Sequence, residues 1–296
     1  MNNSIAVRRT YKDLKVLEND NLEEFGIYYK INDNNLFRIK CMIIGPENTP
    51  YEFGFYFFDI FIPNEYPFKP PKVIFQNRNH KFRFNPNLYV DGKVCISILN
   101  TWSGPQWTSC QSLKSILISL QSLLCQNPLH NEPGFENDFS YRNKIYNNLV
   151  THENYNFSIY KLLENHPENF EDFKDIMKNI FLKNYGKIKS RLDQLEKEKY
   201  NNKRVHSQIY NMEVKCNYEK IKNNLEELYT SFIGVKAIIN KKSLLTVNNK
   251  RRKFVPNQRA CSFEVGYKCL SENNNCYYVV SLNIKQRKYW KRLSSK

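Results

Sequence analysis

The sequence predicts a mixed α/β fold of the α+β class, in which helices flank an antiparallel sheet. Three patterns support this prediction: an amphipathic stretch near the N-terminus, strand-like runs joined by a short turn, and a long stretch of leucine and isoleucine at helical spacing. Hydrophobic residues make up 41% of the 296 residues and charged residues 25%. A chain of this length and composition can bury a core in one or two domains, which excludes a disordered chain.

The first element is predicted to be a short amphipathic helix over residues 7–19. Tyr11, Leu14 and Leu17 fall on one face at helical spacing, and the basic residues lie mostly elsewhere. These basic residues are Arg8, Arg9, Lys12 and Lys15.

Strands are predicted next. Residues 36–44 alternate, with Arg38 and Lys40 on the side opposite the apolar residues, which is typical of a half-solvated antiparallel strand. Residues 53–62 are apolar at nearly every position and indicate a buried central strand, and a turn as short as the one before them makes the pair antiparallel. A further strand is expected at residues 72–76, after a proline-rich extended crossing.

The middle of the chain contains an irregular stretch followed by a core helix. Residues 82–106 show no persistent period, and a long irregular stretch inside a compact domain is usually functional. Thr108 to Gln111 has the pattern of a capping box, and apolar residues then recur at helical spacing until Asn127-Pro128.

Two more helical stretches are predicted at about residues 168–200 and 212–228, and residues 261–284 are rich in strand-forming types. The charge is unevenly placed, because residues 231–296 hold 15 Lys and Arg against 2 Asp and Glu. We therefore expect a basic tail after the helices.

Compartment and redox state follow from absences in the sequence. The chain has no apolar run of about 18 residues, and its first ten residues lack the apolar stretch of a secretory signal, which argues against membrane insertion and export. Eight cysteines with no C-x-x-C pair argue against a disulfide scaffold or a common zinc module. We expect reduced thiols, no bound metal, and a cytoplasmic or nuclear protein.

Cys95 lies in the irregular stretch, directly after an Asp91-Gly92 turn. A free cysteine is often a small buried hydrophobe, and that is the ordinary interpretation. Its context favours another one, because three strings resemble the ubiquitin-conjugating enzyme family in order and spacing over roughly residues 5–150. They are GPENTPYEFGFYFFDIFIPNEYPFKPPKV, FNPNLYVDGKVCISIL and SLKSILISLQSLL.

A narrower resemblance is to the Z-type conjugating enzymes and to the conjugating domain of the giant inhibitor-of-apoptosis ligase. The shared features are NPN in place of the usual His-Pro-Asn, the inserted TWSGPQW and the string NPLHNEPGFE. We therefore expect a conjugating core at residues 1–150, a helical extension at 151–230 and a basic tail of unknown fold at 231–296.

The resemblance implies a four-stranded antiparallel meander flanked by an N-terminal helix, a central helix and C-terminal helices. It also implies a reaction. Cys95 would accept ubiquitin or a ubiquitin-like modifier from an activating enzyme as a thioester and pass it to a substrate lysine, usually with a ligase. ATP would be consumed by the activating enzyme, so no cofactor is expected. The sulfur must then be accessible as thiolate.

The resemblance also assigns residues around Cys95. Asn87, eight residues earlier, would stabilise the developing oxyanion or brace the active-site loop. Glu132 would orient or desolvate the incoming lysine, with His130 as a rival because the alignment slips by one residue there; either could instead just hold the loop. Asn85 replaces the common histidine, which puts loop support by an imidazole in doubt, and Ser97 occupies a gating position.

Docking surfaces are implied in the same way. Phe68, Trp107 and Ser109 match the loops that bind ligases, although Ser109 replaces a common proline and Trp107 alone is better explained by packing. The basic face of the first helix, Arg8, Arg9, Lys12 and Lys15, would contact the activating enzyme or simply be solvated.

Two other functions are compatible with the residues. A cysteine hydrolase would also use Cys95, but no local nucleophile signature supports it. The basic tail, with aromatic residues among its cations, could bind nucleic acid as a second function, and an import signal or a solubilising extension would explain the same charge.

Overall fold

The computed structural model describes residues 5–32, 34–77, 82–245, 268–270, 277–282 and 288–293. It divides into two compact units, residues 1–229 and 230–296. The candidate site lies entirely in the first unit.

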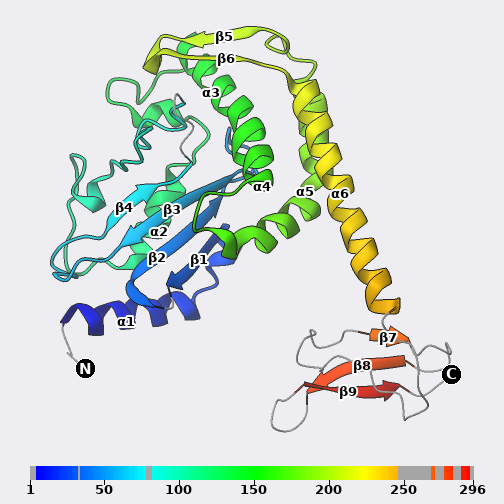
Figure 1. Ribbon diagram of the computed structural model, residues 1–296. Helices are drawn as coiled ribbons and strands as arrows, with labels where there is room; N and C mark the ends of the chain where they lie inside the picture. Colours follow the sequence, from blue (N-terminus) through cyan, green and yellow to red (C-terminus); the bar gives the residue numbers. More distant parts are fainter. Residues whose placement is uncertain are drawn as a thin grey trace. The chain divides into compact units, whose positions relative to one another are not determined.

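A four-stranded antiparallel sheet forms the centre of the first unit (Figure 1). Its strands run in sequence order as β1 (Ile27–Asn32), β2 (Asn35–Ile44), β3 (Phe55–Phe61) and β4 (Lys72–Phe75). The three strands predicted from the residues are confirmed, as is the meander implied by the resemblance. Strand β1 carries no clear alternation, since Tyr28 to Asn32 is mostly half-buried, and residue patterns alone did not predict it.

One face of the sheet is covered by α1 (Ile5–Asn19) and α2 (Leu113–Ser122), which also contact each other. The helix does not begin at Thr108 as predicted. The Thr108 N–H does donate to the Gln111 Oε1 at 2.9 Å, but α2 begins after Ser112, whose hydroxyl accepts from the Ser115 N–H while the Ser115 hydroxyl accepts from the Ser112 N–H. Residues 107–111 form a loop instead of the first turn of the helix. This loop is held in place because Trp107 is buried and Arg9 donates to the Ser109 carbonyl at 2.6 Å. A leucine run is thus an uncertain guide to where a helix starts.

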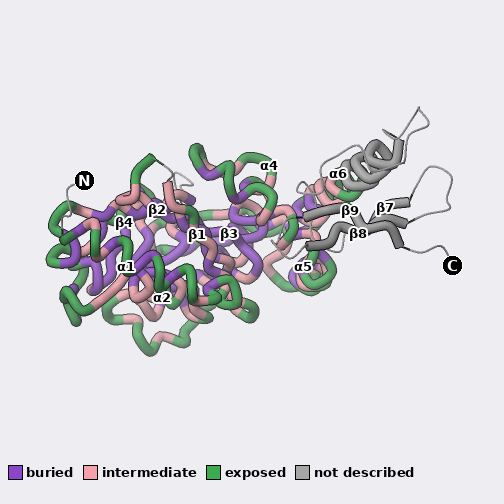
Figure 2. Tube along the Cα trace, turned by 90° about the horizontal axis from the view of Figure 1, so that it is seen from below, coloured by how far each residue is buried: buried purple, intermediate pink, exposed green. Residues whose placement is uncertain are grey.

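The other face of the sheet is not solvated, in contrast to the prediction for β2. Met42 is fully buried on this face, and the side chain of Lys40 is only 13% exposed. The cover comes from the segment η5 (Glu171–Phe173) and the residue before it, because Phe170 and Phe173 pack on Phe57 with ring centroids 5.0 and 6.0 Å away. Strand β3 is buried at every residue but its last, and Figure 2 shows buried residues running through the sheet. Arg38 and Lys40 are paired with Asp59 and Asp172 instead of being left in water.

The chain after the sheet forms a helical extension in the same unit. Its elements are α3 (Tyr141–Glu153), the π-helical segment η4 (Asn154–Lys161), α4 (Leu162–Glu164), α5 (Lys174–Leu195), the hairpin of β5 (Arg204–Ser207) and β6 (Met212–Lys215), and the first part of α6 (Tyr218–Leu245). The first unit ends at Tyr229, within α6. The helix predicted over 168–200 is real but shorter. The helix predicted over 212–228 is wrong at its start, since residues 212–215 pair with β5 and the helix begins only at Tyr218.

Asn154 joins this extension to the sheet. Its side chain is fully buried, accepts from the Tyr56 hydroxyl at 2.7 Å and donates to the Glu52 carbonyl at 2.9 Å. A Cβ atom on Gly54 would lie 1.9 Å from the Asn154 Oδ1. Glycine is therefore required at position 54 by the close approach of the extension, and the two parts of the chain fold as one core.

In the second unit the structure describes a three-stranded antiparallel sheet of β7 (Lys268–Leu270), β8 (Tyr277–Leu282) and β9 (Lys288–Leu293). The strand-forming composition at 261–284 is confirmed where these residues are described. Residues 246–267, which include most of the basic cluster, lie outside the described part. Among the helices that are described, none has the length and apolar character needed to span a bilayer.

Candidate functional site

Cys95 and Asn87 are held together by two hydrogen bonds. The Cys95 backbone N–H donates to the Asn87 carbonyl at 2.9 Å, and the Asn87 Nδ2 donates to the Cys95 carbonyl at 2.5 Å. Asn87 is 7% exposed, and its Oδ1 has no hydrogen-bond partner among the described residues. The two hydrogen bonds between Asn87 and Cys95 brace the loop that carries Cys95. Because an amide nitrogen carries two hydrogens, the oxyanion role stays a prediction compatible with the same geometry.

The accessible sulfur expected from the sequence is not found, because Cys95 is only 2% exposed. Its neighbours Val94 and Ile96 are also buried, and Asn87 fixes its backbone inside the loop. The inserted residues pack close by, since a Cβ on Gly104 would lie 3.2 Å from the Ser97 Cβ. Local opening must therefore precede any reaction at this thiol with a macromolecular partner.

Thr101 clamps the backbone on both sides of Cys95. Its hydroxyl donates to the Val94 carbonyl at 2.8 Å and accepts from the Ile96 N–H at 3.0 Å. Val94 and Ile96 are the residues immediately before and after Cys95, so one hydroxyl fixes the curvature of the nucleophile's own loop. Thr101 was not predicted as a site residue, since a threonine in an insertion carries no signal by itself.

Asn85 supplies the support that was in doubt without the histidine. The fully buried side chain donates to the Leu123 carbonyl at 2.8 Å and to the Tyr51 hydroxyl at 3.0 Å, and its Oδ1 accepts from the Asn87 N–H at 2.9 Å. It thereby ties the Asn87 backbone to the end of α2. An amide is suited to this because it donates and accepts at once.

Glu132 and His130, which were rivals from the sequence, lie in different environments. The His130 Nε2 lies 3.1 Å from the Asp138 carbonyl, and its ring packs edge-on against Phe139 at 4.9 Å, so His130 holds its own loop. Glu132 is half-buried and accepts a hydrogen bond of 2.5 Å from the hydroxyl of Tyr210 in the extension. Both side chains thus make contacts that can hold this loop, and the role of Glu132 at the incoming lysine stays a prediction.

The ligase-binding candidates also differ. Phe68 is 68% exposed, whereas Trp107 is 7% exposed and donates from its indole nitrogen to the Pro67 carbonyl at 2.7 Å. Trp107 therefore braces the loop that carries Phe68, which is the packing interpretation. Ser109 is exposed, and its carbonyl is bound by Arg9.

The four basic residues of α1 are not equivalent. Arg8, Lys12 and Lys15 are exposed. Arg9 is occupied, because it pairs with Asp13 at 2.9 Å and donates to carbonyls of the 109–111 loop. A partner would meet three cations on this helix, while Arg9 fixes α1 to the loop before α2.

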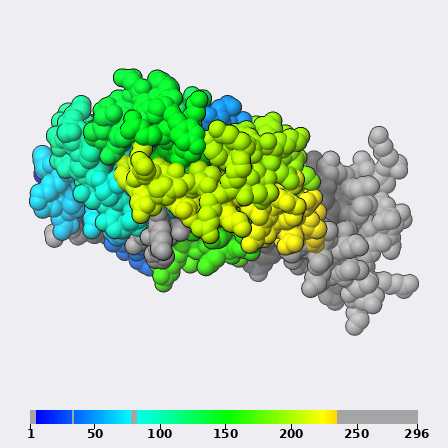
Figure 3. All heavy atoms as spheres, turned by 90° about the horizontal axis from the view of Figure 1, so that it is seen from above, coloured from blue at the N-terminus to red at the C-terminus, as the bar shows by residue number. Residues whose placement is uncertain are grey.

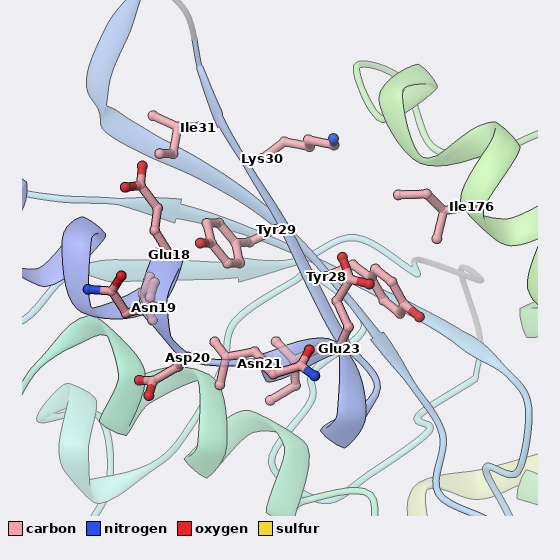
Figure 4. A pocket seen from close by; sticks show the side chains of 13 residues that line it. Glu18, Asn19, Asp20, Asn21, Glu23, Tyr28, Tyr29, Lys30, Ile31 and Ile176 are labelled. Carbon is pink, nitrogen blue, oxygen red and sulfur yellow. The ribbon is translucent and has the colours of Figure 1, made fainter. Parts of the chain in front are cut away.

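None of these candidate residues lines the pocket shown in Figure 4, a hollow of about 530 Å³ between the end of α1, β1 and Ile176. A groove of about 410 Å³ is closer to the chemistry, since Asp91 to Val94 and Thr101 are among its lining residues. Both lie in the first unit. Val94, which precedes Cys95, lines this groove.

The part of the chain that contains the candidate site is also the part that resembles known proteins. The family model described as "Ubiquitin-conjugating enzyme" matches residues 9–153. The chain is 41% identical over 162 residues to "Ubiquitin-conjugating enzyme E2 Z" of Xenopus tropicalis, covering 54% of this chain and 52% of that protein. The human protein of that name is also 41% identical, with 46% of its length covered. The chain thus spans about half the length of these relatives.

A third similarity is to the human "Dual E2 ubiquitin-conjugating enzyme/E3 ubiquitin-protein ligase BIRC6". It is 44% identical over 117 residues, which are 38% of this chain and 2% of that protein. Cys95, Asn87 and Asn85 all lie inside the matched family range, whereas Tyr210 lies beyond it.

Proposed function

Over residues 9–153 the chain belongs to the ubiquitin-conjugating enzyme family, and we propose that Cys95 carries ubiquitin or a ubiquitin-like modifier as a thioester. The modifier would come from an activating enzyme and pass to a substrate lysine, usually with a ligase. The observation that supports this most directly is the pair of hydrogen bonds that fixes Asn87 on Cys95 inside the matched family domain.

In the transfer step, the lysine nitrogen attacks the thioester carbonyl carbon. A C–N bond forms, and the C–S bond breaks with its electron pair going to Cys95. Of the two protons that an ammonium loses on becoming an amide, one returns the leaving thiolate to a thiol and the other goes to solvent. The ammonium group of free lysine has a pKa of about 10.4, so its deprotonation is the harder part of the transfer step at neutral pH.

The side chains of Asn87 and Glu132 are suited to this chemistry. The second N–H of Asn87 can donate to the oxyanion that develops on the carbonyl, and a neutral amide does so without competing as a nucleophile. The Glu132 carboxylate can hold the ammonium and receive its proton. The buried Cys95 requires that its loop open for the modifier's chain end, and Phe68 is the exposed anchor available to a ligase.

The test is a charging panel of modifiers and activating enzymes with ATP. The native protein should gain an adduct that a reductant removes, Cys95→Ser should trap an ester that resists the reductant, and Cys95→Ala should gain nothing. Cys110→Ala is the matched control, since Cys110 is an exposed cysteine in the same unit. An adduct that survives Cys95→Ala, or conjugate cleavage without ATP, would overturn the proposal.

A second function is supported by charge alone. With 15 cations against 2 anions and interspersed aromatic residues, residues 231–296 could bind nucleic acid through phosphate contacts and base stacking. Retention on a DNA or RNA column should then fall steeply with salt and should be lost when residues 231–296 are removed.

A further inference from the structure

The β5–β6 hairpin of the extension carries an unusual residue at its turn. Tyr210 has φ of 58° and ψ of 13°, and the next residue, Asn211, has φ of 48°. Bulky L-residues rarely adopt this left-handed region, and the conformation costs on the order of 1 kcal/mol or more. Such a conformation persists only where surrounding contacts hold it. Figure 3 shows the yellow-green atoms of this part of the chain lying against the cyan and green atoms of the conjugating domain.

Three side chains of the conjugating domain contact Tyr210. Its hydroxyl donates to the Glu132 Oε2 at 2.5 Å, its ring lies 4.1 Å below the guanidinium carbon of Arg83, and it meets the Tyr146 ring edge-on at 6.1 Å. Burial and the bond to Glu132 raise the pKa of the Tyr210 phenol, so it remains a donor across the neutral range.

Arg83 connects this contact to the active-site loop. Its guanidinium lies between two rings, with Tyr89 at 3.7 Å and Tyr210 at 4.1 Å. It also donates to the Pro86 carbonyl, directly before Asn87, while its backbone N–H contacts the Met212 sulfur of β6 at 3.3 Å. The hairpin is thus joined through one side chain to the segment that positions Asn87.

We propose that Tyr210 is a positioning residue for the transfer step, fixing one oxygen of the Glu132 carboxylate so that the other faces the incoming lysine. This inference rests on the proposed function. It assigns the extension a direct part in the reaction, since the tyrosine that orients the candidate acid lies outside the 9–153 family match. Without the hydroxyl, Glu132 keeps its charge but loses its fixed orientation.

The test separates charging from transfer. Tyr210→Phe removes the hydroxyl and keeps the ring on Arg83, so Cys95 should charge with ubiquitin at the native rate. Discharge to free lysine should slow on the order of ten-fold, mainly in the maximal rate, because a misplaced acid costs rate more than binding. Tyr160→Phe is the matched control, because it removes a comparable tyrosine–carboxylate bond, 2.9 Å to Glu164, elsewhere in the extension.

Two further measurements exclude a purely structural effect. Hydroxylamine is largely unprotonated at neutral pH and needs no acid to hold an ammonium, so its reaction with the charged Tyr210→Phe protein should match the native rate. In a Glu132→Gln background, Tyr210→Phe should add little. Equal slowing with both amines, an undiminished effect beside Glu132→Gln, or native discharge to lysine would overturn the inference. Failure of the native protein to charge would instead overturn the proposed function beneath it.

Discussion

The conjugating domain up to residue 153 and the extension from residue 154 to 229 are built differently but fold as one unit. In the domain, a short sequence motif contains the candidate site residues, because Asn85, Asn87 and Cys95 must lie at fixed spacings along one loop. The extension contains no such motif. It packs through aromatic and amide side chains that any amphipathic chain could carry, yet these reach the sheet through Phe170 and the candidate acid through Tyr210. The family match thus contains the proposed nucleophile, whereas some of the residues around the proposed site lie outside the match.

The largest effect should follow from detaching the extension from the sheet. Phe170→Ala removes a ring that is 1% exposed and packs on Phe57, so we expect a loss of about 3–5 kcal/mol in the free energy of unfolding. Urea unfolding measures it. Phe25→Ala, at a residue that is 59% exposed, is the control and should change stability by less than about 0.5 kcal/mol. A loss below about 1 kcal/mol for Phe170→Ala would mean that the extension is not part of the core.

The next effect lies wholly within the domain. Asn87→Ala should slow transfer from charged Cys95 to lysine by about 10²–10³-fold if its amide stabilises the oxyanion. Single-turnover discharge measures this, and charging measured in parallel separates the two roles of Asn87. A variant that charges at the native rate but discharges slowly supports oxyanion stabilisation, whereas equal slowing of both steps indicates that Asn87 only braces the loop.

A smaller effect is expected at the clamp around Cys95. Thr101→Val keeps the shape of the side chain and removes the hydroxyl that joins Val94 to Ile96, so stability should fall by about 1–2 kcal/mol. Because the clamp also keeps Cys95 closed, alkylation of Cys95 should become faster, which peptide mass spectrometry can follow. An unchanged alkylation rate would show that loop opening does not involve this residue.

The contrast between the two regions also explains what could be read from the sequence. Strands β2 to β4 and the helix after Trp107 were predictable from local periodicity and turn residues, whereas the roles of Asn87 and Cys95 were implied by the family resemblance. The solvated face expected for β2 was wrong because Phe170, far along the chain, covers it, and alternation alone cannot reveal a distant cover. Strand β6 was predicted as the start of a helix, and β5 was not predicted, because their pairing with each other cannot be seen in either short segment alone. Tyr210 and Thr101 were not identified, because their roles depend on contacts that no spacing encodes.

The smallest expected effect concerns a buried thiol of the extension. Burial, and to a lesser degree the Glu153 carboxylate, raise the pKa of Cys216 to about 11. In the unfolded chain the thiol has a pKa of about 8.5. Above that pH the thiol of the unfolded chain loses its proton while the thiol of the folded protein keeps it, which favours the unfolded state. The stability that this group contributes is therefore complete below about pH 8.5 and is lost as the pH rises toward 11. The stability advantage of the native protein over Cys216→Ala should shrink by less than about 1 kcal/mol between pH 8 and 9, measured as urea midpoints at each pH. Cys110→Ala controls for the loss of an exposed thiol. If the stability advantage of the native protein over Cys216→Ala instead grows with pH, Cys216 is not a buried neutral thiol but a thiolate stabilised inside the extension.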